Sequence, residues 1–96
     1  IKQLTIMIYY ELHWYVQASE LLDSFVHFVK ANKLLPEMYI NKSNSFIGYF
    51  SRLLKLNYKT GNVSFEISKL ISELEPTSEK WLLKKVRELE KNRLAD

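Results

Sequence analysis

The 96-residue chain contains no cysteine and only two glycines and two prolines. The absence of cysteine excludes disulfides and thiolate metal sites, and it fits a reducing compartment, so we expect a cytoplasmic protein. So few glycines and prolines are typical of long helices joined by few turns. Gly48 and Gly61 alone cannot build a glycine-rich loop that binds phosphate.

The chain also lacks long apolar runs. No segment approaches the roughly 20 consecutive apolar residues that cross a bilayer, so we expect no membrane span. The run LTIMIYY near the start is too short and lacks the flanks of a signal peptide. Because the chain starts at Ile1, inside this apolar pattern, we expect a fragment from the C-terminal part of a longer protein.

Catalytic motifs are missing too, since the sequence has no HExxH motif, no Ser-His-Asp spacing and no cysteine nucleophile. We therefore expect neither enzymatic activity nor a bound cofactor. Glu20, Asp23 and His27 lie at i, i+3 and i+7, which would present two carboxylates and an imidazole to a metal from one helix face. A solvated polar stripe with an Asp23–His27 pair explains the same spacing, and we prefer it to a metal site.

Apolar periodicity is what the sequence does contain. The stretch Tyr15–Lys33 has apolar residues at steps of three and four, which predicts an amphipathic helix with a face wide enough for two neighbours. The predicted stripe comprises Ala18, Leu21, Leu22, Phe25, Val26, Phe28 and Val29. A tight turn about His13 and Trp14 should precede this helix.

Residues 1–12 form the first predicted helix, which is apolar on nearly every side. One face carries Ile1, Leu4, Ile8 and Leu12. The following helix can bury only one side of it. We therefore expect an exposed apolar patch and, in this chain, a symmetric homodimer through residues 1–12.

Three further helices follow. Pro36 suits a first helical turn, and the apolar phase predicts one helix to about Asn57, although the NKSNS run permits a break. A turn at residues 59–62 precedes a helix at about 63–75, and a capping helix spans about 77–94. The prediction is a single all-α helical-repeat domain, with antiparallel hairpins at about 1–33 and 36–75 followed by the cap.

The order of these features resembles a known group of proteins. The elements are YYEL, Tyr15-x-x-Ala18, LLDSFVHFVKANKLLPE, NSFIGYFSRLLKL and EPTSEKWLLKKVREL. Together they look like the C-terminal segment of long, uncharacterised bacterial proteins built of tetratricopeptide (TPR)-like helix pairs. The resemblance covers nearly the whole chain and implies a TPR-like or α-solenoid architecture without any catalytic residue. The chain departs from a standard TPR, because no Trp-x-x-Leu-Gly element precedes Tyr15 and the third helix is too long.

Charge is unevenly distributed along the chain, whose net charge is +3 and whose pI is about 9.1. Residues 1–29 carry one lysine against three acidic residues, and residues 60–96 carry seven charges of each sign. Residues 30–59 carry six cations against Glu37, which leaves +5 in the middle third. Such an excess can attract anionic partners, although it is far below the charge of a dedicated nucleic-acid binder.

Two sets of residues are candidates for binding a partner. Tyr49, Arg52, Lys55 and Lys59 share one side of the third helix. They could form a groove for RNA, single-stranded DNA or an acidic peptide, with Tyr49 as a stacking platform. The alternative is a solvated face whose tyrosine packs over its neighbours.

The second set is Tyr10 and Trp14, beside the first turn. They could form a hot spot for a protein partner, or they could pack against an upstream repeat. The function we expect is a non-enzymatic protein–protein interaction or scaffold domain of the helical-repeat type. The alternative is a nucleic-acid-binding helical domain that uses the basic middle third.

Overall fold

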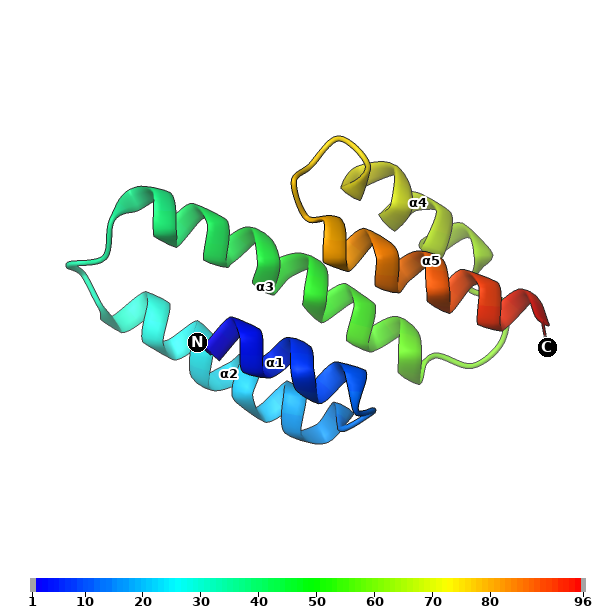
Figure 1. The fold of residues 1–96 in the computed structure, drawn as a ribbon, viewed down its shortest axis with the longest axis horizontal. Helices are drawn as coiled ribbons and strands as arrows, with labels where there is room; N and C mark the ends of the chain where they lie inside the picture. The colour runs from blue at the N-terminus through cyan, green and yellow to red at the C-terminus, as the bar shows by residue number, and fades with distance from the viewer. Residues whose placement is uncertain (1, 96) are drawn as a thin grey trace. The chain divides into compact units, whose positions relative to one another are not determined.

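The computed structural model describes residues 2–95, and these form five α-helices with no β-strand (Figure 1). The helices are α1 (Lys2–Glu11), α2 (Tyr15–Ala31), α3 (Glu37–Tyr58), α4 (Ser64–Leu74) and α5 (Lys80–Ala95). The prediction of an all-α protein is confirmed. The chain divides into two compact units, residues 1–48 and 49–96, with the boundary inside α3. Among the described residues, no helix is both long enough and apolar enough to span a bilayer.

Unit 1 is built on the hairpin of α1 and α2, which lie side by side (Figure 1). The turn between them falls at His13 and Trp14, as predicted. The Trp14 amide donates to the carbonyl of Tyr9 at 2.8 Å, and the His13 amide donates to the carbonyl of Tyr10 at 3.0 Å. His13 has a φ of 62°, in the left-handed region that lets the chain reverse within so few residues.

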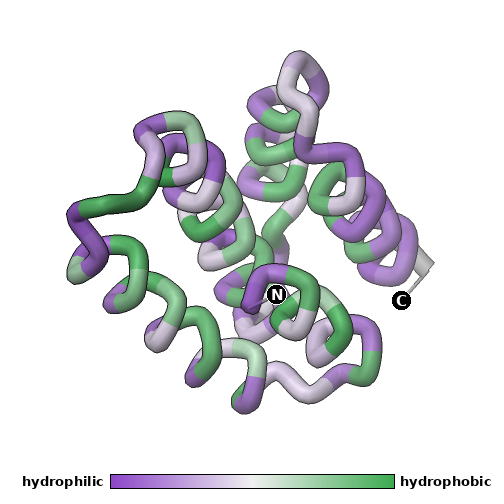
Figure 2. Tube along the Cα trace, turned by 60° about the vertical axis from the view of Figure 1, so that its left-hand side comes forward, coloured by the Kyte–Doolittle hydropathy of each residue, from purple (hydrophilic) through white to green (hydrophobic). Residues whose placement is uncertain are grey.

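The buried side chains of unit 1 follow the helical period. Those on the first two helices are Ile6, Tyr10, Ala18, Leu22, Phe25 and Val29. The predicted phase of α2 is therefore correct at its centre, whereas Phe28 at the edge of the stripe is 38% exposed. The apolar side of α2 is visible as the green segments that recur along its tube in Figure 2.

The first helix does not bury the apolar face that the sequence analysis named for it. Leu4, Ile8 and Leu12 are exposed, while Ile6 and Tyr10 are buried. Ile1, which the sequence assigns to the same face as Leu4, lies outside the described residues. Periodicity could not decide this orientation, because both faces of the helix carry large apolar side chains.

The third helix is continuous from Glu37 to Tyr58, without the break that the NKSNS run allowed. Pro36 accepts the first hydrogen bond, because its carbonyl receives the amide of Ile40 at 3.1 Å. Ser43 is only 3% exposed, so this weak helix former lies on the buried side in the same phase as Phe46. Burial of that side offsets the low helix propensity of the run.

Unit 2 contains the C-terminal part of α3 together with α4 and α5, and α4 packs along α5 (Figure 1). Its core residues are Phe50, Leu53, Leu54, Leu56, Val63, Ile67, Leu70, Leu74, Leu82 and Val86. Phe50 stacks on Trp81 with ring centroids 6.2 Å apart. Gly61, with a φ of 82°, provides the left-handed residue in the predicted turn before α4.

The last helix begins at Lys80, three residues later than the predicted start at Thr77. The Thr77 hydroxyl donates to the carbonyl of Leu74 at 2.6 Å and accepts the amide of Glu79 at 3.2 Å. These bonds satisfy the end of α4 and hold Thr77 outside α5. A threonine at this position therefore closes one helix, and the predicted start of the capping helix was wrong.

Candidate partner-binding surfaces

Three of the four candidate residues lie in α3, and Lys59 follows directly after its end at Tyr58. Arg52, Lys55 and Lys59 line a common cleft, whereas Tyr49 does not line it. Tyr49, Arg52, Lys55 and Lys59 all belong to unit 2. The guanidinium carbon of Arg52 lies 5.9 Å from the ring centroid of Tyr49, which is within the range of a cation–π contact. Arg52, a neighbour on the same helix, thus covers one face of the tyrosine ring. This contact favours the alternative interpretation, in which the tyrosine packs over its neighbours on a solvated face.

Two of the three cations in this set form ion pairs with glutamates on α4. Arg52 donates to both carboxylate oxygens of Glu73, at 2.8 and 2.9 Å. Lys59 donates to Glu66 at 3.1 Å. Arg52 and Lys59 are seven residues apart, and their partners Glu73 and Glu66 are seven residues apart in the opposite order. The two segments therefore run antiparallel in one register.

These pairs change the electrostatics of the surface. The hydrogen bond from Arg52 lowers the pKa of Glu73 below its ordinary value, and the same bond raises the pKa of Arg52. The hydrogen bond from Lys59 lowers the pKa of Glu66. Both glutamates are therefore ionised at neutral pH, and they compensate much of the positive charge that the sequence suggested.

An open cleft of about 270 Å³ lies between the two ion pairs. It is lined by Arg52, Lys55, Leu56, Lys59, Phe65, Glu66, Lys69 and Leu70. Leu56 and Leu70 are buried and form an apolar floor, whereas Phe65 is 75% exposed. Lys55 and Lys69 are exposed, and neither is within ion-pair distance of a carboxylate in the part of the chain that the structure describes.

Sequence analysis missed Phe65 and Lys69 as parts of this surface. A signal was present, because Phe65 is a large aromatic residue outside the apolar stripe of its helix. The position of Lys69 opposite the third helix carries no such signal. It depends on the register between α3 and α4.

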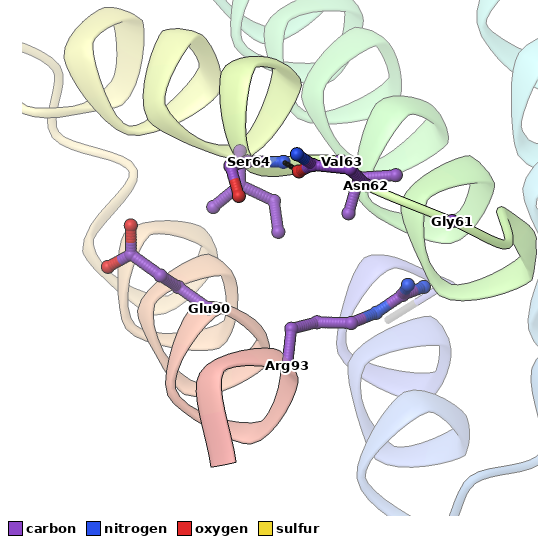
Figure 3. A pocket seen from close by; sticks show the side chains of 7 residues that line it. Gly61, Asn62, Val63, Ser64, Glu90 and Arg93 are labelled. Atoms are coloured by element: carbon purple, nitrogen blue, oxygen red, sulfur yellow. Dashed lines mark hydrogen bonds between the residues drawn. The ribbon is translucent and has the colours of Figure 1, made fainter. Parts of the chain in front are cut away.

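A second cleft, of about 340 Å³, lies between the start of α4 and the end of α5 (Figure 3). Its lining comprises Gly61, Asn62, Val63, Ser64, Ile67, Glu90 and Arg93. The Asn62 side-chain oxygen accepts the amide of Ser64 at 2.9 Å, and Arg93 donates to backbone carbonyls at the end of α3. Asn62 thus binds the backbone at the start of α4, and Arg93 binds the backbone at the end of α3. Because both polar groups have these structural roles, we do not assign a ligand to this cleft.

The candidate hot spot at the first turn is only partly accessible. Tyr10 is 7% exposed, and its ring centroid lies 5.2 Å from that of Tyr15. It is a core residue of unit 1 and offers little surface to a partner. Trp14 is 49% exposed, with its ring 5.7 Å from that of Tyr9, so it remains a candidate.

The exposed apolar side chains of the first helix lie one turn apart. Leu4, Ile8 and Leu12, which we call the α1 face, are 59%, 48% and 50% exposed. Their positions at i, i+4 and i+8 make one continuous stripe along the helix surface. An apolar patch of this kind is typical of an interaction site.

The polar stripe on the second helix stays open to solvent, since Glu20, Asp23 and His27 are all exposed. Within residues 2–95, no three histidine, aspartate or glutamate side chains come close enough together to hold a metal ion.

Comparison of the chain with protein-family models, with curated proteins and with solved structures found no match. The TPR-like resemblance therefore stays a prediction, and any function must be argued from the surfaces described above.

Proposed function

We propose that this chain is a non-enzymatic protein-interaction domain that pairs with a second copy of itself through the α1 face. The observation that supports this proposal is the exposure of Leu4, Ile8 and Leu12, each at least 48%, along one side of α1. Three large apolar side chains in solvent, one turn apart, are costly to leave uncovered. Complete burial of a fully exposed side chain of this size contributes about 1.5–3 kcal/mol, and these half-exposed side chains would contribute about half as much each.

A second copy suits this face because its three large side chains are apolar and repeat along the helix. If two copies of α1 pair antiparallel about a two-fold axis at Ile8, Ile8 meets its own counterpart and Leu4 meets Leu12. Lys2 lies away from the stripe, whereas Glu11, three residues after Ile8 and seven after Leu4, borders it and would stay at the solvated edge of the paired surface. Trp14, which follows the helix, can add aromatic contact area at the margin.

The architecture supports the same function. Helical hairpins such as α1–α2 expose an apolar side that a neighbouring hairpin covers in repeat proteins. We therefore propose a scaffold role of the helical-repeat type, in which the α1 face meets either another hairpin of the same kind or a second copy. The chain needs no catalytic group for this role.

The experiment is analytical ultracentrifugation or light scattering over a concentration series. The wild-type chain should show reversible self-association, and Ile8→Glu should shift it to the monomer because a charge would be buried at the two-fold axis. Leu34→Glu is the matched control, because Leu34 is 94% exposed in the α2–α3 connection and lies outside the α1 face. Circular dichroism should show the same helix content in all three proteins.

Two outcomes would count against the proposal. One is a wild-type chain that stays monomeric at high concentration. The other is an equal loss of self-association in Ile8→Glu and Leu34→Glu, which would indicate a general effect of added charge.

A nucleic-acid-binding helical domain is the second candidate. It is favoured by the +5 charge of residues 30–59 and by the position of Tyr49 beside Arg52. We rank it lower because Arg52 and Lys59 are paired with glutamates. Of the cations in the predicted set, Lys55 alone has no ion pair with a carboxylate of the described residues.

A further inference from the structure

We propose that the cleft between α3 and α4 binds an acidic peptide segment. A carboxylate of the peptide would lie between Lys55 and Lys69, and a large apolar side chain would pack against Phe65. This surface belongs to unit 2 and does not depend on pairing through the α1 face.

The register of the two helices brings the two lysines to the same level. Arg52 pairs with Glu73 at one end of the cleft, and Lys59 pairs with Glu66 at the other. In an antiparallel arrangement with these partners, Lys55 lies opposite Leu70, and Lys69 lies opposite Leu56. The middle of the cleft therefore carries one lysine from each wall.

These two lysines differ from the cations at the ends of the cleft. Neither forms an ion pair with a carboxylate of the described residues, and both are exposed beside a shared apolar floor. Lys69 helps to lower the pKa of Glu73, one turn further along α4, but it and Lys55 are like charges that repel each other. An anionic group between them would be attracted by both, so the local charge is complementary to a carboxylate.

The apolar part of the cleft indicates what should accompany that carboxylate. Phe65 is 75% exposed although it borders a floor made of Leu56 and Leu70, which are 5% and 0% exposed. A large apolar side chain that enters the cleft would be covered by Phe65 and would rest on this floor. Aromatic residues at the edge of a pocket are common anchors in protein interfaces.

A peptide fits this cleft better than a nucleic acid does. Glu66 and Glu73 lie at the two ends and remain ionised, because the ion pairs lower the pKa of each. A nucleic acid carries a phosphate at every nucleotide, so phosphates that flank the central site would approach these carboxylates. A peptide can place one or two acidic residues at the centre and neutral or basic residues at the ends.

The probes are short fluorescein-labelled peptides with Glu-Glu-Leu at the centre of a neutral sequence. Fluorescence anisotropy should show saturable binding of this peptide. Replacement of both glutamates by glutamine, or of the leucine by alanine, should weaken binding by about tenfold or more, which corresponds to about 1.4 kcal/mol. Single-stranded oligouridine of similar length serves as the competing class of ligand.

The protein variants separate this cleft from general electrostatics. Lys55→Glu with Lys69→Glu, and separately Phe65→Ser, should each lower the affinity for the peptide at least tenfold. Lys84→Glu with Lys91→Glu is the matched control, because it makes the same change of charge at exposed positions on α5. The control should bind within about twofold of the wild type, and thermal unfolding should show that every variant is folded.

Several results would overturn the proposal. They are the absence of saturable binding at millimolar peptide, equal binding of the glutamate and glutamine peptides, and equal weakening in the control variant. Tighter binding of oligouridine that is lost in Lys55→Glu with Lys69→Glu would assign the cleft to nucleic acid. None of these results bears on self-association through the α1 face, which is measured without peptide.

Discussion

Arg93 of α5 donates hydrogen bonds from its guanidinium to the backbone carbonyl of Leu56 at 2.8 Å and also to that of Lys59 at 2.7 Å. Leu56 lies in the last turn of α3, where a helix leaves its final carbonyls without intrahelical donors. A cation at this end also interacts favourably with the helix dipole. The end of the third helix is thus closed by a residue 37 positions further along the chain.

Replacement of Arg93 should destabilise unit 2. We expect Arg93→Ala to lower the free energy of unfolding in urea by about 1–3 kcal/mol, the usual range for hydrogen bonds to a charged group. Arg93→Lys should cost less, because it keeps the charge but cannot reach both carbonyls in the same geometry. Lys91→Ala, at an exposed position on the same helix, is the control and should change stability by less than about 0.5 kcal/mol. Equal effects of Arg93→Ala and Lys91→Ala would show that the two carbonyl bonds add nothing to stability.

The ion pairs between α3 and α4 predict a dependence of stability on acid. The pKa values of Glu73 and Glu66 are lowered by Arg52 and Lys59, so each carboxylate stabilises the folded state at pH values above the ordinary range near 4.5. This contribution should be lost as the pH falls below that range and the folded-state groups take up protons. Denaturation of the wild type and of Glu73→Gln between pH 7 and pH 3 measures it.

The wild type should lose more stability over this interval than Glu73→Gln, which has no carboxylate to protonate at this position. For Glu79→Gln the sign is reversed, so this variant should lose more stability than the wild type as the pH falls. The reason is that burial raises the pKa of Glu79, and its charged form opposes folding at neutral pH. We expect Glu79→Gln to be at least as stable as the wild type at pH 7. Identical acid profiles for the wild type and Glu73→Gln would contradict the pairing with Arg52.

The core of unit 1 should depend on Phe25, which is 2% exposed at the centre of α2. We expect Phe25→Ala to cost on the order of 3–5 kcal/mol, the usual range for removal of a buried aromatic side chain. Phe28→Ala is a matched control on the same helix, since Phe28 is 38% exposed and should cost far less. A loss below about 1 kcal/mol for Phe25→Ala in urea unfolding would mean that the helix is packed in another phase.

Nucleic-acid binding should be weak and sensitive to salt. The positive charge of the middle third is spread over thirty residues, and glutamates compensate Arg52 and Lys59. Titration of labelled single-stranded and duplex oligomers near physiological salt should give no sub-micromolar affinity. If such affinity is found and is lost when Arg52, Lys55 and Lys59 become glutamate, the nucleic-acid function replaces the one proposed.

The sequence by itself determined the positions of the helices and most of the inward-facing residues. Periodicity and turn residues are local signals, and they were sufficient wherever one side of a helix is clearly apolar, as in α2 around Phe25. They were insufficient in α1, where apolar residues point in every direction. There, only packing against a neighbour decided that Tyr10 is buried and that Leu4, Ile8 and Leu12 are exposed.

Tertiary structure alone decided which charges are paired between helices and which charged side chain is buried. Lys85 is 6% exposed because its stem lies in the interior, while its amine reaches Glu88 at 3.0 Å and lies 5.9 Å from the ring centroid of Trp81. Arg52 and Glu73 are 21 residues apart, and their pairing depends on the register between two helices. No periodic pattern within one helix records that register, because it arises from the packing of side chains across the interface. The same register brings Lys55 and Lys69 to one level of the cleft, where the sequence showed only two separate lysines.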